Sequence, residues 1–455
     1  MKIVIAGGGK VGYTIAKYLS VENSDVVVID KRDAAIERIN NNLDVMCIKG
    51  SCTSLKVLME AGVNESDIFI AVTDSDELNM LCSLAAKKLG SKYTVSRVRN
   101  PEFDEDINLL TEAIGIDLVI NPEKEAAIEI SKLIKFPKAC AVDEFSNGRV
   151  NLIGFDIVDE LLYLTGKRIS DIDCIRGTIL VCAVEHDDKL IIPNGDYIFG
   201  DNDRVYIIGE HKDIQSFFKR IKRYNKKVRT AMIVGGGKIS YYLAKIITEA
   251  GVNSKIIEIN KDKCEELTEL LPNSIVINGD GLDEQLLLSE NLTNADSFIT
   301  LTDRDEDNLI AGLFASRMNV SNIITKITRD NYMAMSKSIG INSVISPKAV
   351  TANKIIKYAR SIKGSKGSDI ENIYKICNDK AEAIEFIVGN GCRNLGIKFK
   401  NVQFKENFIV ALIVRNKEII IPTGDDYLQI HDRVIIVNSD EKPVELNDIF
   451  LGGEK

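Results

Sequence analysis

The sequence lacks several features that whole classes of protein require. Its longest apolar runs, such as Phe408–Val414, have the length of a β-strand and fall far short of the ~18 residues of a membrane-spanning helix. The formal net charge is −9, so the chain also lacks the excess of basic residues that marks a nucleic-acid-binding surface. We therefore expect a chain that does not cross a bilayer alone and has no nucleic-acid partner.

Residues for catalysis and metal binding are sparse as well. The three histidines, His186, His211 and His431, occupy positions where a solvated surface is the expected setting. The nine cysteines include no C-x-x-C pair, which favours reduced, mostly structural thiols over a zinc site. No Ser/His/Asp or Cys/His set stands out. We predict no catalytic residue, no metal site and no enzymatic activity.

We also expect no secretion signal. Met1–Ala6 runs directly into a buried-strand pattern, which leaves no room for a charged region, a long apolar region and a cleavage site. The expected location is the cytoplasm.

What the chain does have is an internal duplication. Two glycine-rich turns, Gly7–Gly12 and Gly235–Ser240, lie in different halves of the sequence. Asp30 and Glu258 have the same separation in the numbering as Gly7 and Gly235. A repeat that extends over half the chain copies whole domains, because solenoid repeats are only about 20 to 50 residues long.

Each copy begins with alternating strand and helix patterns. In the first copy, β-branched strand patterns occur at Lys2–Ala6, Val26–Asp30, Val45–Lys49, Ile68–Val72, Tyr93–Val98 and Leu118–Asn121. Amphipathic helical patterns lie between them, at Val11–Leu19, Ala34–Asn40, Ser54–Glu60 and Glu77–Leu89. Strands joined by helical crossovers predict a parallel sheet that is covered on both faces.

After this region the pattern changes to closely spaced strands, at Val150–Val158, Thr178–Val184, Lys189–Pro193 and Arg204–Gly209. The predicted fold class is therefore α/β, with two Rossmann-like doubly wound parallel-sheet domains, each followed by a small α+β domain. The predicted domains are 1–135, 136–225, 226–362 and 363–455. We interpret the basic stretch 219–229 as a solvated helix end plus linker, and 361–369 as a flexible joint.

The first glycine turn has the context of a dinucleotide-binding site, because Gly7 follows a strand and Lys10 opens a helix. Gly7 permits the tight turn, and Gly9 lets a pyrophosphate approach the backbone. The helix N-terminus then offers free N–H groups and partial positive charge to the phosphates. Close helix–strand packing alone is the structural alternative.

The acid Asp30 ends the second strand, at about the 20-residue spacing from the glycines that dinucleotide-binding sites show. There it can accept hydrogen bonds from ribose hydroxyls and repel a 2′-phosphate, which favours NAD(H) over NADP(H). The neighbouring cations Lys31 and Arg32 weaken this preference. The ribose of ATP or ADP would satisfy Asp30 equally well, so these nucleotides stay alternatives. In the second copy Ser240 replaces the third glycine and Glu258 replaces the aspartate, which leaves open whether that copy binds or only keeps the architecture.

Further candidates follow the fourth and fifth strands, because ligands of open α/β sheets lie beyond the carboxyl ends of the strands. They are Thr73, Asp74 and Arg97 in the first copy, with Thr302 and Lys326 in the second. The two cations suit either a phosphate contact or a salt bridge to a neighbouring subunit. Thr73 could also act as a helix N-cap.

Several of these motifs together resemble a known family. They are Ala6–Gly12, Val28–Asp30, Lys49-Gly50, Ala71–Asp74 with Asp76–Asn79, Arg97, and the Ile-Ile-Pro and Asp-Arg-Val signatures of both small domains. The chain is similar to the peripheral, NAD-binding subunits of Trk potassium-uptake systems, which contain two tandem copies of the domain pair that regulates potassium conductance (RCK).

The resemblance implies a cytoplasmic protein, peripheral on the inner face of the cell membrane, that forms a homo-oligomeric ring under a separate potassium-translocating subunit. Nucleotide binding would alter the ring and hence the pore. The implied contacts with NAD(H), or with ATP or ADP, are Gly7, Gly8, Gly9, Lys10, Val11, Asp30, Thr73, Asp74, Arg97, Gly235, Gly236, Gly237, Lys238, Ile239, Glu258, Thr302 and Lys326. An NAD-dependent oxidoreductase and a soluble nucleotide sensor without a membrane partner are the alternatives.

Overall fold

The structure is a computed structural model. It describes residues 1–21, 24–103, 111–112, 114–137, 139–146, 148–158, 161, 164–172, 177–187, 189–220, 228–338, 341, 343–363, 368–376, 381–439, 443 and 445–451. The chain forms two compact units; the smaller contains Met1–Ile128, Tyr241–Leu243 and Ile345–Ala359, and the larger contains the remainder. Residues 221–227 of the predicted basic linker and 364–367 of the predicted joint lie outside the described residues. The residue boundaries of the four domains stay predictions.

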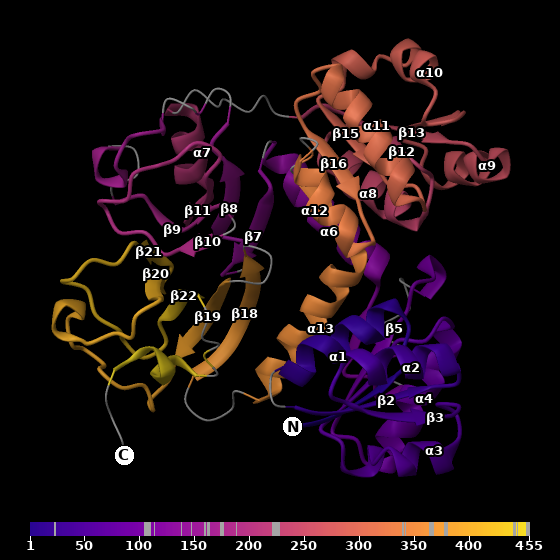
Figure 1. The fold of residues 1–455 in the computed structure, drawn as a ribbon, viewed down its shortest axis with the longest axis horizontal. Helices are drawn as coiled ribbons and strands as arrows, with labels where there is room; N and C mark the ends of the chain where they lie inside the picture. The colour runs from indigo at the N-terminus through magenta and orange to yellow at the C-terminus, as the bar shows by residue number, and fades with distance from the viewer. Residues whose placement is uncertain are drawn as a thin grey trace. The chain divides into compact units, whose positions relative to one another are not determined.

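The first sheet is parallel and has the order β3-β2-β1-β4-β5-β6. Figure 1 labels its strands β2, β3 and β5. Its strands are β1 (Lys2–Ala6), β2 (Asp25–Asp30), β3 (Met46–Lys49), β4 (Ile68–Ala71), β5 (Tyr93–Arg97) and β6 (Leu118–Ile120). The connecting helices include α1 (Lys10–Val21), α2 (Asp33–Asn42), α3 (Leu55–Glu60) and α4 (Asp76–Leu89), and α6 (Pro122–Lys135) follows β6. The strand order reverses between β1 and β4, which is where doubly wound sheets bind ligands.

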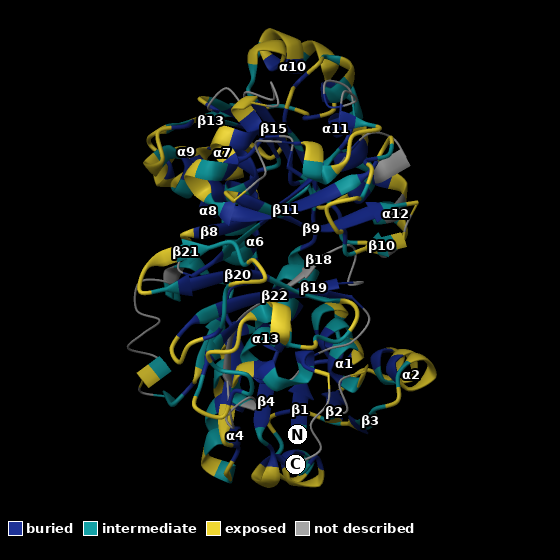
Figure 2. Cartoon of the chain, turned by 90° about the vertical axis from the view of Figure 1, so that its left-hand side faces the viewer, coloured by how far each residue is buried: buried dark blue, intermediate teal, exposed yellow. Residues whose placement is uncertain are grey.

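Burial in this sheet has the pattern of a central parallel sheet. The successive residues Ile3, Val4 and Ile5 of β1 have no exposed surface, so both faces of the strand are covered. Figure 2 shows the same pattern, with dark blue strands and exposed residues on the outer turns of α2.

The second sheet repeats the first, with the order β14-β13-β12-β15-β16-β17. Its strands are β12 (Thr230–Val234), β13 (Asn253–Glu258), β14 (Ser274–Asn278), β15 (Ser297–Thr300), β16 (Ile323–Lys326) and β17 (Ser343–Ile345). The accompanying helices are α8 (Lys238–Glu249), α9 (Lys261–Leu270), α10 (Glu284–Ser289), α11 (Asp305–Arg317), α12 (Asp330–Ser338) and α13 (Pro347–Lys363). Helices α2 and α9 hold the same place in their copies and each have 10 residues, so the duplication extends to individual elements.

Two antiparallel five-stranded sheets complete the fold, in the orders β10-β9-β11-β8-β7 and β18-β19-β22-β20-β21. The strands of the first are β7 (Ala141–Phe145), β8 (Val150–Asp156), β9 (Ile179–His186), β10 (Lys189–Ile191) and β11 (Arg204–Glu210), followed by helix α7 (His211–Arg220). Those of the second are β18 (Ser368–Ile376), β19 (Ala381–Val388), β20 (Phe408–Arg415), β21 (Glu418–Ile420) and β22 (Arg433–Ser439). The predicted fold class, two Rossmann-like domains with two small α+β domains, is therefore confirmed.

The two antiparallel sheets share one hydrophobic core within the larger unit. Buried residues of the first, such as Leu152 and Ala183, cluster with buried residues of the second, such as Leu412 and Ile435. Each small module therefore buries part of its apolar surface against the other, while residues such as Phe386 and Leu428 form a further core within the second module. Among the described residues, no helix is both long enough and apolar enough to cross a membrane.

Candidate functional site

The first glycine turn is built so that the backbone passes very close to the next element. Gly7 has a φ of +108°, and a Cβ there would lie 2.9 Å from the carbonyl oxygen of Val72. A Cβ at Gly12 would lie 1.8 Å from the carbonyl oxygen of Gly7. The backbone of the first turn therefore leaves no room for a side chain at either position. At Gly9 a Cβ would meet only the Arg32 guanidinium, at 3.7 Å, so this residue leaves open space beside the turn.

Asp30 lies under the turn with 6% of its surface exposed. Its Oδ2 accepts a hydrogen bond from the Gly8 amide at 2.7 Å, and its Oδ1 accepts one from the Arg32 amide at 2.9 Å. The Arg32 side chain adds two more, from Nε to Oδ1 at 3.1 Å and from Nη2 to Oδ2 at 3.0 Å. Burial raises the pKa of Asp30, but the hydrogen bonds from Arg32 and Gly8 outweigh it and hold the pKa below its ordinary value.

Thr73 lies two residues after the end of β4 and is held by Asn79 of α4. The Thr73 amide and hydroxyl both donate to Asn79 Oδ1 at 2.7 Å, and Asn79 Nδ2 donates to the Arg97 carbonyl at 2.9 Å. Asn79 therefore ties the ends of β4 and β5 together. The helix N-cap is Ser75, whose Oγ accepts from the Leu78 amide at 3.1 Å, so the interpretation of Thr73 as the N-cap is wrong.

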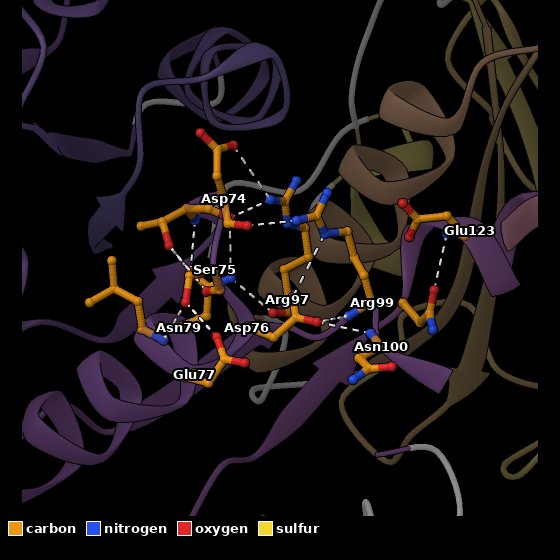
Figure 3. Close-up of polar contacts among 12 residues, drawn as sticks. Asp74, Ser75, Asp76, Glu77, Asn79, Arg97, Arg99, Asn100 and Glu123 are labelled. Carbon is orange, nitrogen blue, oxygen red and sulfur yellow. Dashed lines mark hydrogen bonds and ion pairs between the residues drawn. The ribbon is translucent and has the colours of Figure 1, made fainter. Parts of the chain in front are cut away.

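Cations gather at the carboxyl ends of β4 and β5 (Figure 3). Arg97 is 8% exposed, donates from Nη2 to the Thr73 carbonyl and lies 3.8 Å from the exposed Asp74 carboxylate. Burial, and then the neighbouring charge of Arg99, lower the pKa of Arg97. Its buried Nε has no hydrogen-bond partner among the described residues. A buried guanidinium with spare donors next to the switch point is suited to an anion.

The second turn repeats the geometry of the first, except that a serine stands at the position of Gly12. Gly235 has a φ of +97°, and the Gly236 amide donates to Glu258 Oε2 at 2.6 Å. Ser240, which takes the place of Gly12, is fully buried and donates its hydroxyl to the Gly235 carbonyl. Serine thus turns the close approach into a hydrogen bond, and the shape of the turn is kept.

The remaining residues of the second copy match the first in the same way. The Thr302 amide and hydroxyl donate to Asn308 Oδ1 at 2.8 and 2.9 Å. Asn308 Nδ2 donates to the Lys326 carbonyl at 3.0 Å, and Lys326 Nζ lies 3.5 Å from the exposed Asp303 carboxylate. Lys10 and Lys238 begin α1 and α8 and are exposed, while Ile239 is buried.

The structure therefore gathers the predicted residues of each copy around its own turn, with the first set in the smaller unit and the second in the larger. Sequence reasoning gave Asn79 no role beyond its place in a family motif, and it missed Asn308, Arg38 and Arg99. The two asparagines could have been found, because their separation in the numbering equals the one that relates Thr73 to Thr302. The two arginines have no counterpart of the same type in the second copy, so the repeat gives no signal for them.

A cavity of about 390 Å³ lies elsewhere in the larger unit, between α6, α7 and α8. Its walls are mostly apolar, with Phe136, Phe218 and Ile246 among them, and none of the predicted nucleotide contacts lines it. The cavity is therefore not part of either predicted nucleotide site.

Comparisons with known proteins agree with this arrangement. The TrkA-N domain family matches residues 3–122 and 231–347, and the TrkA-C domain family matches residues 157–222. The chain is 33% identical to the Trk system potassium uptake protein TrkA homolog 1 of Methanosarcina mazei, over 99% of this chain and 100% of the relative. It is 30% identical to the Trk system potassium uptake protein TrkA of Haemophilus influenzae, over 99% of this chain and 98% of the relative.

Solved structures share the fold at low identity. The GsuK RCK domain aligns with a TM-score of 0.62 and 16% identity, over 96% of this chain and 92% of that one. The GsuK channel bound to NAD aligns with the same TM-score and identity, over 96% and 76%. The duplicated TrkA-N matches and the full-length relatives together show that the chain belongs to the TrkA family of Trk system potassium uptake proteins.

Proposed function

We propose that this chain is a regulatory subunit of a potassium uptake system that binds NAD(H) at both glycine turns and gates a separate membrane potassium-translocating subunit. It would act as a homo-oligomeric ring on the inner face of the cell membrane. ATP or ADP is the alternative ligand. The relatives named as Trk potassium uptake proteins and the fold shared with an NAD-bound channel support this proposal.

The observation that carries the proposal is the duplicated carboxylate beneath each turn. Asp30 and Glu258 both receive the second glycine amide of their turn, at 2.7 and 2.6 Å, and both lie at the end of the second strand of their sheet. That is the place from which an acid reaches the ribose hydroxyls of a bound nucleotide. We assign the contacts to Gly7–Val11, Asp30, Thr73, Asp74, Arg97 and, in the second copy, to Gly235–Ile239, Glu258, Thr302 and Lys326.

Calorimetric titration of the full chain with NADH tests the binding. Two molecules per chain would mean that both copies bind; one would mean that the second copy keeps only the architecture. No binding of NADH, ATP or ADP would overturn the proposal.

Gating requires a ligand that binds two conformations with different affinity, because equal affinity shifts no equilibrium. It is tested by reconstituting the chain with the potassium-translocating subunit in vesicles and measuring rubidium flux with and without nucleotide. Unchanged flux, or failure of the chain to associate with the membrane subunit, would favour a soluble nucleotide sensor.

An oxidoreductase is the competing function, and it predicts turnover of NADH with an organic substrate. Hydride transfer needs a general acid or base beside the nicotinamide. The two histidines with the clearest contacts serve the small modules instead, since His186 pairs with Asp203 and His211 lies beside Asn151. We expect no substrate-dependent oxidation of NADH.

A further inference from the structure

The two glycine turns differ in the group that holds the carboxylate. In the first copy, the four hydrogen bonds from Gly8 and Arg32 fill the four lone-pair positions of Asp30. In the second copy, the Asn260 amide makes the same backbone bond to Glu258, at 2.8 Å, but the Asn260 side chain caps α9 by accepting from the Lys263 amide. A ribose can therefore reach Glu258 directly, whereas it must displace the Arg32 guanidinium from Asp30.

The displaced guanidinium is free to move toward a ligand. The Arg32 side chain is 50% exposed, and its Nη1 lies 3.9 Å from the exposed Asp74 carboxylate across the turn. It also stands 3.7 Å from the position of a Cβ at Gly9. Arg32 thus lies beside the part of the turn where phosphates are expected.

A second arginine lies at the same turn. Arg38 Nη2 donates to the carbonyl oxygens of Gly8 and Gly9 at 2.8 and 3.2 Å, and its guanidinium lies over the Tyr13 ring, 4.8 Å from the centroid. Its counterpart is Glu266, which holds the same place in α9 as Arg38 holds in α2. The sign of the charge is therefore reversed at this position between the copies.

The two copies also differ in their basic residues at the carboxyl ends of the parallel strands. The Arg99 amide donates to Asp76 at 2.8 Å, and the Thr328 amide donates to Asp305 at 2.9 Å, which makes Thr328 the counterpart of Arg99. Arg97 corresponds to Lys326 through the shared asparagine bond. The second copy has two arginines without a basic counterpart, Arg304 and Arg329. They lie near Asp307 and Glu306, just as Arg32, Arg97 and Arg99 lie near carboxylates in the first copy.

Formal charges summarise the comparison. Arg32, Arg38, Arg97 and Arg99 give the first copy +4, with neutral Ser75 and Asn100 at the two further positions. Lys326, Arg304, Arg329 and Glu266 give the second copy 3 − 1 = +2, with neutral Asn260 and Thr328. Each added phosphate on a ligand carries further negative charge, so its binding is favoured where cations are concentrated.

We propose that Arg32 and Arg38 make the first nucleotide site selective for phosphate charge beyond a bridging pyrophosphate, a selectivity that the second site lacks. The inference rests on the proposed function, because it assigns ligand preference to the sites proposed there. The additional phosphate can come from the terminal group of ATP or from the 2′-phosphate of NADPH.

The test exchanges residues between the two copies. In each variant the unmodified copy serves as the control. Arg32→Asn and Arg38→Glu give the first copy the residues of the second, and Asn260→Arg with Glu266→Arg does the reverse. Calorimetry of the full-length variants with ATP, NADPH and NADH, at low and high salt, gives the affinity and stoichiometry for each ligand. All four positions are exposed, so folding is expected to be kept and is checked by circular dichroism.

In the wild type we expect one class of sites that binds ATP or NADPH tightly with a strong salt dependence. Arg38→Glu should weaken that binding by about tenfold or more, whereas NADH binding should change far less. Arg32→Asn should weaken the more highly charged ligand and strengthen NADH, because Asp30 is then open to the ribose. The reverse exchange should create a second tight site for the more highly charged ligand.

The two ligands separate the two sources of the phosphate. If the substitutions change only the affinity for ATP, the arginines contact the terminal phosphate of the triphosphate. If they change only the affinity for NADPH, the arginines contact the 2′-phosphate of the ribose. Equal ratios of ATP, NADPH and NADH affinity in all variants would overturn the inference and leave the proposed function intact. Absence of binding of every nucleotide to the wild type would instead overturn the proposed function.

Discussion

At the residue scale, the glycines of the first turn have different roles, although they are adjacent in the sequence. Gly7 combines a left-handed φ with backbone atoms 2.9 to 3.0 Å from a Cβ position, whereas Gly9 faces only the end of a flexible side chain. The first is fixed by the fold, and the second is available to a ligand.

This difference gives a matched pair of variants. Gly7→Ala should destabilise the first Rossmann-like domain by about 1–3 kcal/mol, because alanine is strained at this φ and its Cβ meets the Val72 carbonyl. Gly9→Ala should leave stability nearly unchanged and weaken nucleotide binding. Guanidinium unfolding and calorimetry measure the two effects, and equal loss of stability in both variants would contradict the assignment.

His186 is the second residue with a specific consequence. Its Nδ1 lies 2.6 Å from the buried Asp203, and the hydrogen bond and charge of Asp203, with a smaller contribution from Asp187, raise the pKa of His186. In the second small module the same position is Arg415, which pairs with Asp432 at 2.7 Å. One module thus has a titratable cation where the other has a permanent one.

The sign of the pH dependence follows from the direction of this shift. A histidine whose folded pKa is raised stabilises the fold fully below its unfolded pKa, and this stabilisation is lost as pH rises through the folded pKa. We expect the protection factors of the β9 and β10 amides, which are corrected for the base-catalysed intrinsic exchange rate, to fall above neutral pH. His186→Arg, which copies the second module, should remove that fall; if the protection factors keep their pH profile in the variant, another group is responsible.

At the element scale, each Rossmann-like domain depends on one buried asparagine that joins a helix to two strand ends. Asn79 of α4 and Asn308 of α11 each accept two hydrogen bonds from a threonine and donate to the carbonyl of the cationic residue that ends the next strand. Because both asparagines are fully buried, truncation leaves several polar groups without partners.

We expect Asn79→Ala to destabilise its domain by about 1–3 kcal/mol per group left unsatisfied, and to increase amide exchange at the ends of β4 and β5. Asn308→Ala should have the same effect on β15 and β16. Each variant serves as the control for the other, since exchange in the unmodified copy should stay at the wild-type rate. Increased exchange in both copies after one substitution would contradict this view.

At the scale of the whole molecule, the two small modules fold as one body within the larger unit. Their sheets share a core that includes Leu152 and Leu412, and the Ser146 amide and hydroxyl donate to the fully buried Glu385 of the second module. Segments from the two halves of the sequence therefore complete each other's burial.

Leu152→Asp tests this shared core. A carboxylate in this fully buried position of the first module should destabilise both modules together, because an unpaired buried charge is costly. Hydrogen exchange should accelerate in β20 and β22 as well as in β8. Ile198→Asp, at a residue that is 52% exposed, is the control. If exchange accelerates only in the first module, the two modules are stable independently of each other.

The sequence by itself determined the duplication, the α/β class, the glycine turns and the acids beneath them. These features depend on local spacing, such as that between Gly7 and Asp30, and on periodicity within single elements. The tertiary structure alone decided that Arg32 covers Asp30, that Arg38 reaches the glycine carbonyls from α2, and that the small modules share a core. The physical reason is that side-chain pairing and burial between distant segments depend on how elements pack, which no local pattern encodes.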